Sequence, residues 1–527
     1  MSASLKEEIT REVEKRRTFA IISHPDAGKT TLTEKLLLFG GAIREAGSVK
    51  ARKASRHATS DWMEIEKQRG ISVTSSVMQF DYQGHRINIL DTPGHQDFSE
   101  DTYRTLTAAD SAVMLIDVAK GVEPQTIKLF QVCSKRGIPI FTFINKLDRE
   151  GQNPFDLMEE IERVLGIRSV PMNWPIGMGR DLCGVYDRMK NQVELFNGKD
   201  HSTIEVRKVE DYNDPIIREM AGDFITDQLI ADLELLDVAG DPFDFEKVSK
   251  GELTPVFFGS AVNNFGVQTF LENFLQLAPK PTPRQTVDGT VEPTNEKFTG
   301  YVFKIQANMN PAHRDRIAFL RICSGKFDRG MTVKHVRAGK DIKLSQPQQF
   351  LAQDRDIVES AYPGDIIGLF DPGIFRIGDS LAQGGNVEFN ELPTFSPEIF
   401  AKVTVKNALK HKQYQKGIDQ LTEEGTIQVF RTTNFDETIL GVVGQLQFEV
   451  FEYRMRAEYG VEVQLHRMSY QFARWIIDDN IDPSKFRINS TLVKDKKDNY
   501  VVLFENEYAM RTAMEKNPTA KFLETAP

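Results

Sequence analysis

The sequence predicts a multidomain α/β protein: a P-loop α/β domain over 1–283 with an insertion at about 150–255, a β-barrel over 284–385, and a small α/β domain over 386–527. Three observations predict this division. Apolar strand-like runs alternate with helical patterns in the first half, which is typical of an open α/β sheet. A proline-rich linker at 277–283 suits neither a helix nor a central strand. Short strands punctuated by glycine follow the linker, as in a barrel.

The composition supports a multidomain protein with an ordinary core. Hydrophobic residues make up 40% and charged residues 27% of the 527 positions. No uninterrupted apolar run approaches the length of a membrane span and the first residues lack a signal-peptide core, so we expect a cytoplasmic protein and a monomer without membrane contacts. Cys133, Cys183 and Cys323 are far apart, which argues against a disulfide or zinc framework. The net charge of −10 argues against indiscriminate nucleic-acid binding.

A phosphate-binding loop is predicted at 23–31, because a β-branched and aromatic run precedes it and an apolar helical pattern follows. Backbone N–H groups at the helix N-terminus would face the phosphates, and Lys29 would add a positive charge. The Thr30 hydroxyl can bind Mg²⁺, and Gly28 lets the backbone approach closely. Ser23 stands where the general pattern has its first glycine. Taken alone, the match also fits a glycine turn beside a surface lysine.

The segment 91–95 follows a second apolar strand, so Asp91 is expected at the edge of the sheet where open α/β sheets bind ligands. There its carboxylate can hold Mg²⁺ through water. Gly94 can present its N–H to a γ-phosphate, a contact that hydrolysis removes. His95 then lies where a nucleophilic water must stand. A structural or surface histidine is the alternative.

Two further segments predict recognition of guanine. Asp148 offers two acceptors to the N1–H and N2–H₂ donors of guanine, whereas adenine presents the opposite pattern. Lys146 would lie along the base, and Asn145 would brace the loop and the purine N7. Ser260 and Ala261, after another apolar strand, would direct backbone N–H groups at the guanine O6. Each segment alone also fits an ordinary strand-end turn.

A basic segment at 44–57 lies between the first two motifs and has no clear apolar period. A solvated loop and a mobile switch that contacts a phosphate backbone are equally consistent with its charge. Ser72 follows shortly after it and is a candidate second hydroxyl ligand for Mg²⁺.

The four motifs in this order predict a GTPase with GTP or GDP and Mg²⁺ as ligands. We expect His95 and Lys29 to be catalytic and Thr30, Ser72 and Asp91 to bind the metal. The predicted nucleotide-binding residues are Ser23, His24, Pro25, Asp26, Ala27, Gly28, Lys29, Thr30, Thr31, Asp91, Thr92, Pro93, Gly94, His95, Asn145, Lys146, Asp148, Ser260 and Ala261.

Together with the segments 61–64 and 69–72, these motifs resemble those of bacterial translational GTPases of the elongation factor G-like branch. The resemblance covers essentially the whole chain. It implies a ribosome-stimulated GTP hydrolase whose partners are both ribosomal subunits and their RNA. It also implies that Pro25 and Ile71 flank His95 as an apolar gate, and that the barrel is the second domain of this family.

Within this family the chain resembles the release-factor type rather than the translocase type, because only one modest domain fits after the barrel. The segments 444–450 and 469–475 also resemble the release-factor type. A helix is expected over 444–459, with Gly460 as its cap. The implied function is a GTPase of translation termination that promotes dissociation and recycling of codon-reading release factors after peptide release. Two alternatives remain: another ribosomal GTPase of the elongation or rescue kind, and a GTP-gated ribosome-binding protein with little catalysis.

Overall fold

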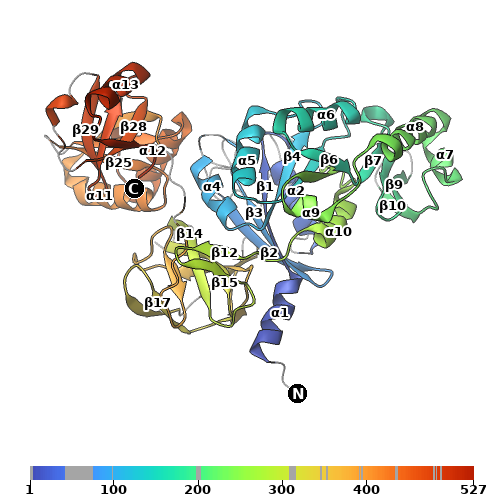
Figure 1. Ribbon diagram of the computed structural model, residues 1–527, viewed down its shortest axis with the longest axis horizontal. Coiled ribbons are helices and arrows are strands. Elements are labelled where there is room, and N and C mark those ends of the chain that lie inside the picture. The colour runs from blue at the N-terminus through green and yellow to red at the C-terminus, as the bar shows by residue number, and fades with distance from the viewer. Residues whose placement is uncertain are drawn as a thin grey trace.

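The computed structural model divides visibly into three bodies joined through short connections (Figure 1). A parallel-sheet domain carries an insertion at its far end, a barrel follows, and a C-terminal α/β domain lies beside both. The structure describes residues 4–41, 75–95, 97, 99–197, 203–307, 316–344, 347–351, 354–390, 392, 396–433, 437–478, 481, 483–486 and 489–526.

In the described residues the first domain is built on a seven-stranded sheet in the order β2-β3-β1-β4-β5-β11-β6. Neighbouring strands are parallel except β2 and β3. The strands are β1 (Arg16–Ser23), β2 (Ser76–Tyr82), β3 (His85–Asp91), β4 (Ser111–Asp117), β5 (Ile140–Asn145), β6 (Arg168–Pro171) and β11 (Leu253–Phe258). β4 and β5 are buried along their whole length, as their continuous apolar runs require.

Helices cover both faces of this sheet. Leu106, Leu129 and Leu157 pack from α4, α5 and α6 on one face. Leu36 and Phe274 pack from α2 and α10 on the other. The helices of this domain outside the insertion are α1 (Leu5–Lys15), α2 (Lys29–Phe39), α4 (Ser99–Thr107), α5 (Pro124–Lys135), α6 (Pro154–Leu165), α9 (Phe245–Ser249) and α10 (Val267–Leu277). The carboxyl ends of β1, β3, β5 and β11 therefore meet at one edge, and a predicted motif follows or ends each of them.

The insertion forms a separate antiparallel sheet in the order β10-β9-β8-β7. Its buried Trp174 donates a hydrogen bond from Nε1 to Asp232 Oδ2 at 3.0 Å and packs against Phe258, which fastens the insertion to the main sheet. An acidic helical stretch is broken at Gly222, whose φ is +80°, because a left-handed residue cannot continue a helix. The elements are β7 (Asn173–Ile176), β8 (Gly184–Asp187), β9 (Gln192–Asn197), β10 (Thr203–Lys208), α7 (Pro215–Ala221) and α8 (Asp223–Ala239).

The described part of the barrel is an antiparallel eight-stranded sheet, ordered β18-β17-β23-β14-β15-β22-β19-β20, that curls around Phe298, Leu320 and Leu381. A short hairpin, β12–β13, and a short antiparallel pair, β16 with β21, accompany it. The strands are β12 (Arg284–Thr286), β13 (Gly289–Val291), β14 (Thr299–Ala307), β15 (Arg316–Ser324), β16 (Phe327–Asp328), β17 (Thr332–His335), β18 (Lys340–Lys343), β19 (Gln348–Leu351), β20 (Asp354–Ile357), β21 (Ser360–Ala361), β22 (Ile366–Phe370) and β23 (Ser380–Ala382).

The described residues of the C-terminal domain form an antiparallel sheet in the order β27-β24-β26-β25-β29-β30-β28-β31, with three α-helices. The predicted helix over 444–459 is confirmed as α12, and Gly460, with a φ of +66°, ends it as expected. The elements are β24 (Ile399–Val405), α11 (His411–Glu423), β25 (Gln428–Thr432), β26 (Thr438–Val442), α12 (Gln445–Tyr459), β27 (Val463–Arg467), β28 (Phe472–Ile477), β29 (Ser490–Asp495), β30 (Tyr500–Phe504), α13 (Glu507–Lys516) and β31 (Lys521–Leu523).

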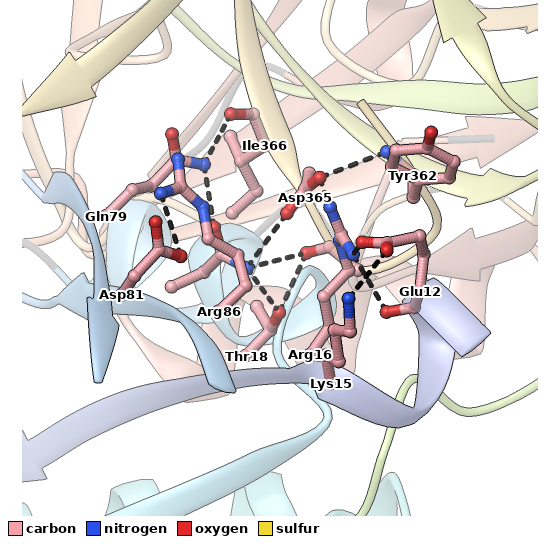
Figure 2. A network of polar contacts seen from close by, with 12 residues as sticks. Glu12, Lys15, Arg16, Thr18, Gln79, Asp81, Arg86, Tyr362, Asp365 and Ile366 are labelled. Atoms are coloured by element: carbon pink, nitrogen blue, oxygen red, sulfur yellow. Dashed lines mark hydrogen bonds and ion pairs between the residues drawn. The ribbon is translucent and has the colours of Figure 1, made fainter. Parts of the chain in front are cut away.

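A buried polar network joins the parallel-sheet domain to the barrel (Figure 2). Arg16 donates from Nε to Asp365 Oδ2 at 2.9 Å, and each of these side chains is only 7% exposed. The Arg16 guanidinium lies 4.7 Å from the centroid of the Tyr362 ring. Gln79 donates from Nε2 to the Ile366 carbonyl at 2.8 Å. We call this set the barrel joint.

A different contact joins the parallel-sheet domain to the C-terminal domain. The Leu446 N–H at the start of α12 donates to Asp97 Oδ2 at 2.7 Å. Gly444 lies so close that a Cβ there would stand 2.0 Å from Asp97 Cγ, and a Cβ on Gly425 would stand 1.7 Å from Arg104 Nη1. We call this set the C-terminal joint. Gly444 stands against the short Asp97 carboxylate, and Gly425 has a φ of +75°, which favours glycine.

Candidate nucleotide site

The predicted phosphate loop connects β1 to α2 as expected. Asp26 and Gly28 have φ values of +66° and +99°, so the backbone turns sharply before the helix begins at Lys29. A Cβ on Gly28 would lie 2.3 Å from Asn145 Nδ2, which leaves no room for a larger residue. Thr30 and Thr31 lie in the first turn of α2. This loop therefore presents a helix N-terminus, which favours anions.

Lys29 and Asp91 meet at the floor of the site. Lys29 Nζ lies 2.5 Å from Asp91 Oδ1, and the two residues are 6% and 2% exposed. Asp91 Oδ2 and Ser23 Oγ are buried and have no hydrogen-bond partner among the described residues. A buried carboxylate oxygen without a partner suits a hard cation or its water, since such an atom is costly to leave unsatisfied. The residues present therefore fit Mg²⁺ beside a phosphate group.

The rest of the segment 91–95 packs against the phosphate loop. A Cβ on Gly94 would lie 3.5 Å from the Pro25 backbone, so the two segments are in contact. Thr92 is fully buried and donates from Oγ1 to the Ile21 carbonyl at 2.7 Å. Buried Pro93 accepts at its carbonyl from the Thr102 hydroxyl at 3.3 Å. Thr92 therefore anchors the segment to β1 through its hydroxyl.

His95 is partly exposed and is paired with a residue that the motif search missed. Its Nδ1 lies 3.2 Å from Asp97 Oδ1 and accepts from the Asp97 N–H at 3.3 Å. Asp97 is buried, and its other oxygen accepts from Leu446. The sequence shows Asp97 two residues after His95, and this spacing was the available signal. It was missed because the partner of Asp97 on α12, Leu446, is remote in the chain.

On the base side, Asn145 connects the two loops of the pocket. Its Nδ2 donates to the Ala27 carbonyl at 2.9 Å, and its Oδ1 accepts from the Ala261 N–H at 2.9 Å. Asp148 Oδ1 accepts from the Ser260 hydroxyl at 2.6 Å. Asn145 thus holds the two loops together through both ends of its amide, and its contact with the purine N7 stays a prediction.

Lys146 is held in a left-handed conformation with a φ of +72°. Its Nζ donates to the Asp26 carbonyl at 2.5 Å and to Asp117 Oδ2 at 2.6 Å. Burial alone would raise the pKa of Asp117, but the hydrogen bonds from Lys146 and from the Ala119 N–H outweigh it and lower the pKa. Asp117, at the end of β4, is a second residue that sequence reasoning missed, although its place at a strand end beside the motifs is the kind of signal that identified Asp91.

The N–H groups expected to face the guanine O6 both have protein acceptors here. The Ser260 N–H donates to the Phe265 carbonyl at 2.9 Å, and the Ala261 N–H donates to Asn145. A contact to O6 would require these bonds to be exchanged or shared, so it stays a prediction. Ser72, Ile71 and the basic segment 44–57 lie outside the described residues.

His24 lies beside the loop entrance, with Nε2 at 3.4 Å from Glu123 Oε1 and a buried Nδ1 that has no partner among the described residues. The site thus collects a helix N-terminus, a lysine, a carboxylate and a histidine at one edge of the sheet. In the described part of the chain, no helix has both the length and the apolar character needed to cross a membrane.

Three family models match successive parts of the chain. The Elongation factor Tu GTP binding domain matches residues 14–280, Elongation factor G domain 2 matches 297–384, and the Class II release factor RF3, C-terminal domain matches 389–514. A crystal structure of a protein from Thermus thermophilus shares the fold, with a TM-score of 0.70 at 23% identity over 92% of this chain and 72% of that one. These matches confirm the predicted fold class and the GTPase family, whose members bind guanine nucleotides and hydrolyse GTP.

Curated relatives extend over nearly the full chain. A peptide chain release factor 3 from Symbiobacterium thermophilum is 63% identical over 519 residues, which is 98% of each chain. One from Listeria innocua is 55% identical over 515 residues, again 98% of each chain. The chain therefore belongs to the peptide chain release factor 3 family, the translational GTPases that act in termination.

Proposed function

We propose that the ribosome stimulates GTP hydrolysis by this chain, and that hydrolysis promotes dissociation and recycling of codon-reading release factors after peptide release. The observation that carries the proposal is the convergence of four separated motifs at one sheet edge, with the buried Lys29 and Asp91 at its centre. The match of the C-terminal domain to release factor 3 supports the role in termination.

The phosphate side of the pocket combines the α2 N-terminus with Lys29. The α2 N-terminus and Lys29 bind the phosphates, and Lys29 exchanges the Asp91 carboxylate for phosphate oxygens when GTP enters. Thr30, Ser72 and Asp91 would hold Mg²⁺, which when bound would supply positive charge to the transferred phosphoryl group. Asp91 Oδ2 is the described atom best placed for this role, since it is buried and has no partner among the described residues.

Hydrolysis depends on His95, which orients the attacking water, and on Gly94, whose N–H donates to the γ-phosphate. We expect the isolated protein to turn over slowly, because His95 is turned toward Asp97 and is partly exposed. The ribosome would complete the site by fixing His95, with help from ribosomal RNA. On the base side, Asp148 recognises guanine while Lys146 and Asn145 shape its pocket.

The test is peptide release from stop-codon ribosomal complexes held in excess over a codon-reading release factor, with this protein and GTP present or absent. We expect faster multiple turnover with GTP and loss of that gain in His95→Ala, which should still bind GTP. Ribosome-stimulated hydrolysis without faster recycling would reject the termination role in favour of another ribosomal GTPase. Faster recycling that survives in His95→Ala would point to a GTP-gated binding protein.

A further inference from the structure

The insertion contacts the loop that follows β11 and carries Ser260 and Ala261. The first contact lies at the N-terminal end of this loop. Asn173, at the start of β7, donates from Nδ2 to the Phe258 carbonyl at 2.9 Å and accepts at Oδ1 from the Phe258 N–H at 2.7 Å. Asn173 is fully buried. The residue it holds immediately precedes the segment 259–261. A primary amide that pairs with both polar groups of one residue fixes that backbone in position and orientation.

The insertion also contacts the other end of the loop. Glu194, on β9, accepts at Oε2 from the Gly266 N–H at 2.8 Å, and Gly266 caps the N-terminus of α10. The Thr269 N–H is a second donor to this carboxyl group. Glu194 is 2% exposed, and its Oε1 has no partner among the described residues. A buried carboxylate at a helix N-terminus is stabilised by the exposed N–H groups and the helix dipole.

Between these two points the chain forms a closed loop. Ser260 and Phe265 exchange both backbone hydrogen bonds at 2.9 Å. Ser260 and Ala261 lie inside the loop and contact Asp148 and Asn145. Because the loop is pinned at both ends by the insertion, its position relative to Asp148 depends on the insertion as well as on the main sheet.

We propose that the insertion controls the release of guanine nucleotide, with Asn173 and Glu194 as positioning residues that clamp the two ends of the base-recognition loop. The proposal rests on the proposed assignment of this loop and Asp148 to the guanine base. It gives the insertion a defined task in the nucleotide cycle: to set how long the nucleotide stays bound.

The clamp is sensitive to protons at one end only. Burial, and to a smaller extent the nearby carboxylates of Asp187 and Glu272, raise the pKa of Glu194 to about 7 against the opposing N–H groups of Gly266 and Thr269. Lys190 is paired with Glu272 rather than with Glu194, at 3.0 Å. The charged form of Glu194 is the better cap, so the cap strengthens as the pH rises through about 7 and weakens below it.

The experiment measures dissociation of a fluorescent GDP from the full chain between pH 6 and pH 8. We expect Asn173→Ala and Glu194→Gln each to speed release roughly tenfold at pH 8, since each removes or weakens a buried hydrogen bond worth about that factor. Wild-type release should slow as the pH rises, and this pH dependence should disappear in Glu194→Gln. Arg218→Ala, an exposed change on α7 of the same insertion, is the matched control and should leave release unchanged.

Asp148→Asn separates this inference from the assignment of the base site. If Asp148→Asn leaves guanine affinity unchanged, the base-site assignment fails. If Asp148→Asn weakens guanine binding but both insertion variants release GDP like the wild type, the clamp is refuted. Should Asn173→Ala fail to fold, the pH profile of the wild type against Glu194→Gln still decides, and a flat wild-type profile with unchanged release in Glu194→Gln overturns the proposal.

Discussion

The barrel joint and the C-terminal joint differ in which part of the parallel-sheet domain they contact. The barrel joint begins at Arg16, at the start of β1, whereas the phosphate loop follows the other end of that strand. The C-terminal joint begins at Asp97, two residues after His95. The segment 91–95 contacts the phosphate loop. On the proposed assignment of Gly94 to the γ-phosphate, a shift of this segment would therefore reach the C-terminal joint before the barrel joint.

The largest effect is expected from Arg16→Ala in the barrel joint. The change leaves Asp365 buried without its cation, so the free energy of unfolding should fall by about 3–5 kcal/mol. Urea unfolding of the full chain measures it. Guanine-nucleotide affinity of the folded fraction should change little. A loss below about 1 kcal/mol would show that the buried pair is not what holds this joint.

A smaller but more specific effect is expected from Asp97→Ala in the C-terminal joint. It removes both the contact to His95 Nδ1 and the acceptor for Leu446, so ribosome-stimulated hydrolysis should fall about tenfold or more, as misplaced catalytic groups do. GTP affinity should not change. Asp97→Asn keeps an acceptor for Leu446 but loses the charge beside His95. If Asp97→Asn hydrolyses GTP like the wild type, the carboxylate has no part in positioning His95.

Gly444→Ala tests the same joint from the opposite side. The added Cβ would collide with the Asp97 carboxylate, so the carboxylate or α12 must shift, and hydrolysis should fall several-fold, as in Asp97→Ala. Stimulated turnover is the measurement. Combining Gly444→Ala with Asp97→Ala should add little, because both act through one contact. Additive losses would mean that Gly444 acts elsewhere.

The smallest effect is expected from Lys280→Ala. Lys280 pairs with Glu14 near the barrel joint, but each side chain is 55% exposed. The substitution should lower the free energy of unfolding by no more than about 0.5 kcal/mol, measured by thermal denaturation. A loss as large as that of Arg16→Ala would contradict the view that burial, rather than the number of ion pairs, decides the strength of the barrel joint.

Much of the pocket was predictable because its motifs are contiguous. A glycine before a lysine at a strand end needs no distant information, and neither does the cap at Gly460. The acidic pattern from about 209 to 236 predicts one helical stretch, whereas α7 ends before Gly222 and α8 begins after it. Contacts between distant residues were also missed. Asp97 meets Leu446 across 349 positions.

The contact between Asn173 and the loop that carries Ser260 could not be predicted from the sequence either. Asn173 and Phe258 are 85 positions apart, and no periodicity connects them. Thr92 was predicted as a nucleotide-binding residue, and nothing in the sequence indicated that its fully buried hydroxyl would donate to the Ile21 carbonyl. Asn145 was predicted to brace the loop, but the sequence did not predict that both ends of its amide would form hydrogen bonds.

The Asn145 amide links the two loops of the pocket. Asn145 joins the carbonyl of Ala27 to the N–H of Ala261, so a single side chain sets the spacing between the loop at the phosphates and the loop at the base. A shift of either loop must strain or break one of these bonds. On the proposed assignment of these two loops to the phosphates and the base, we expect binding at one loop to be coupled to binding at the other through Asn145.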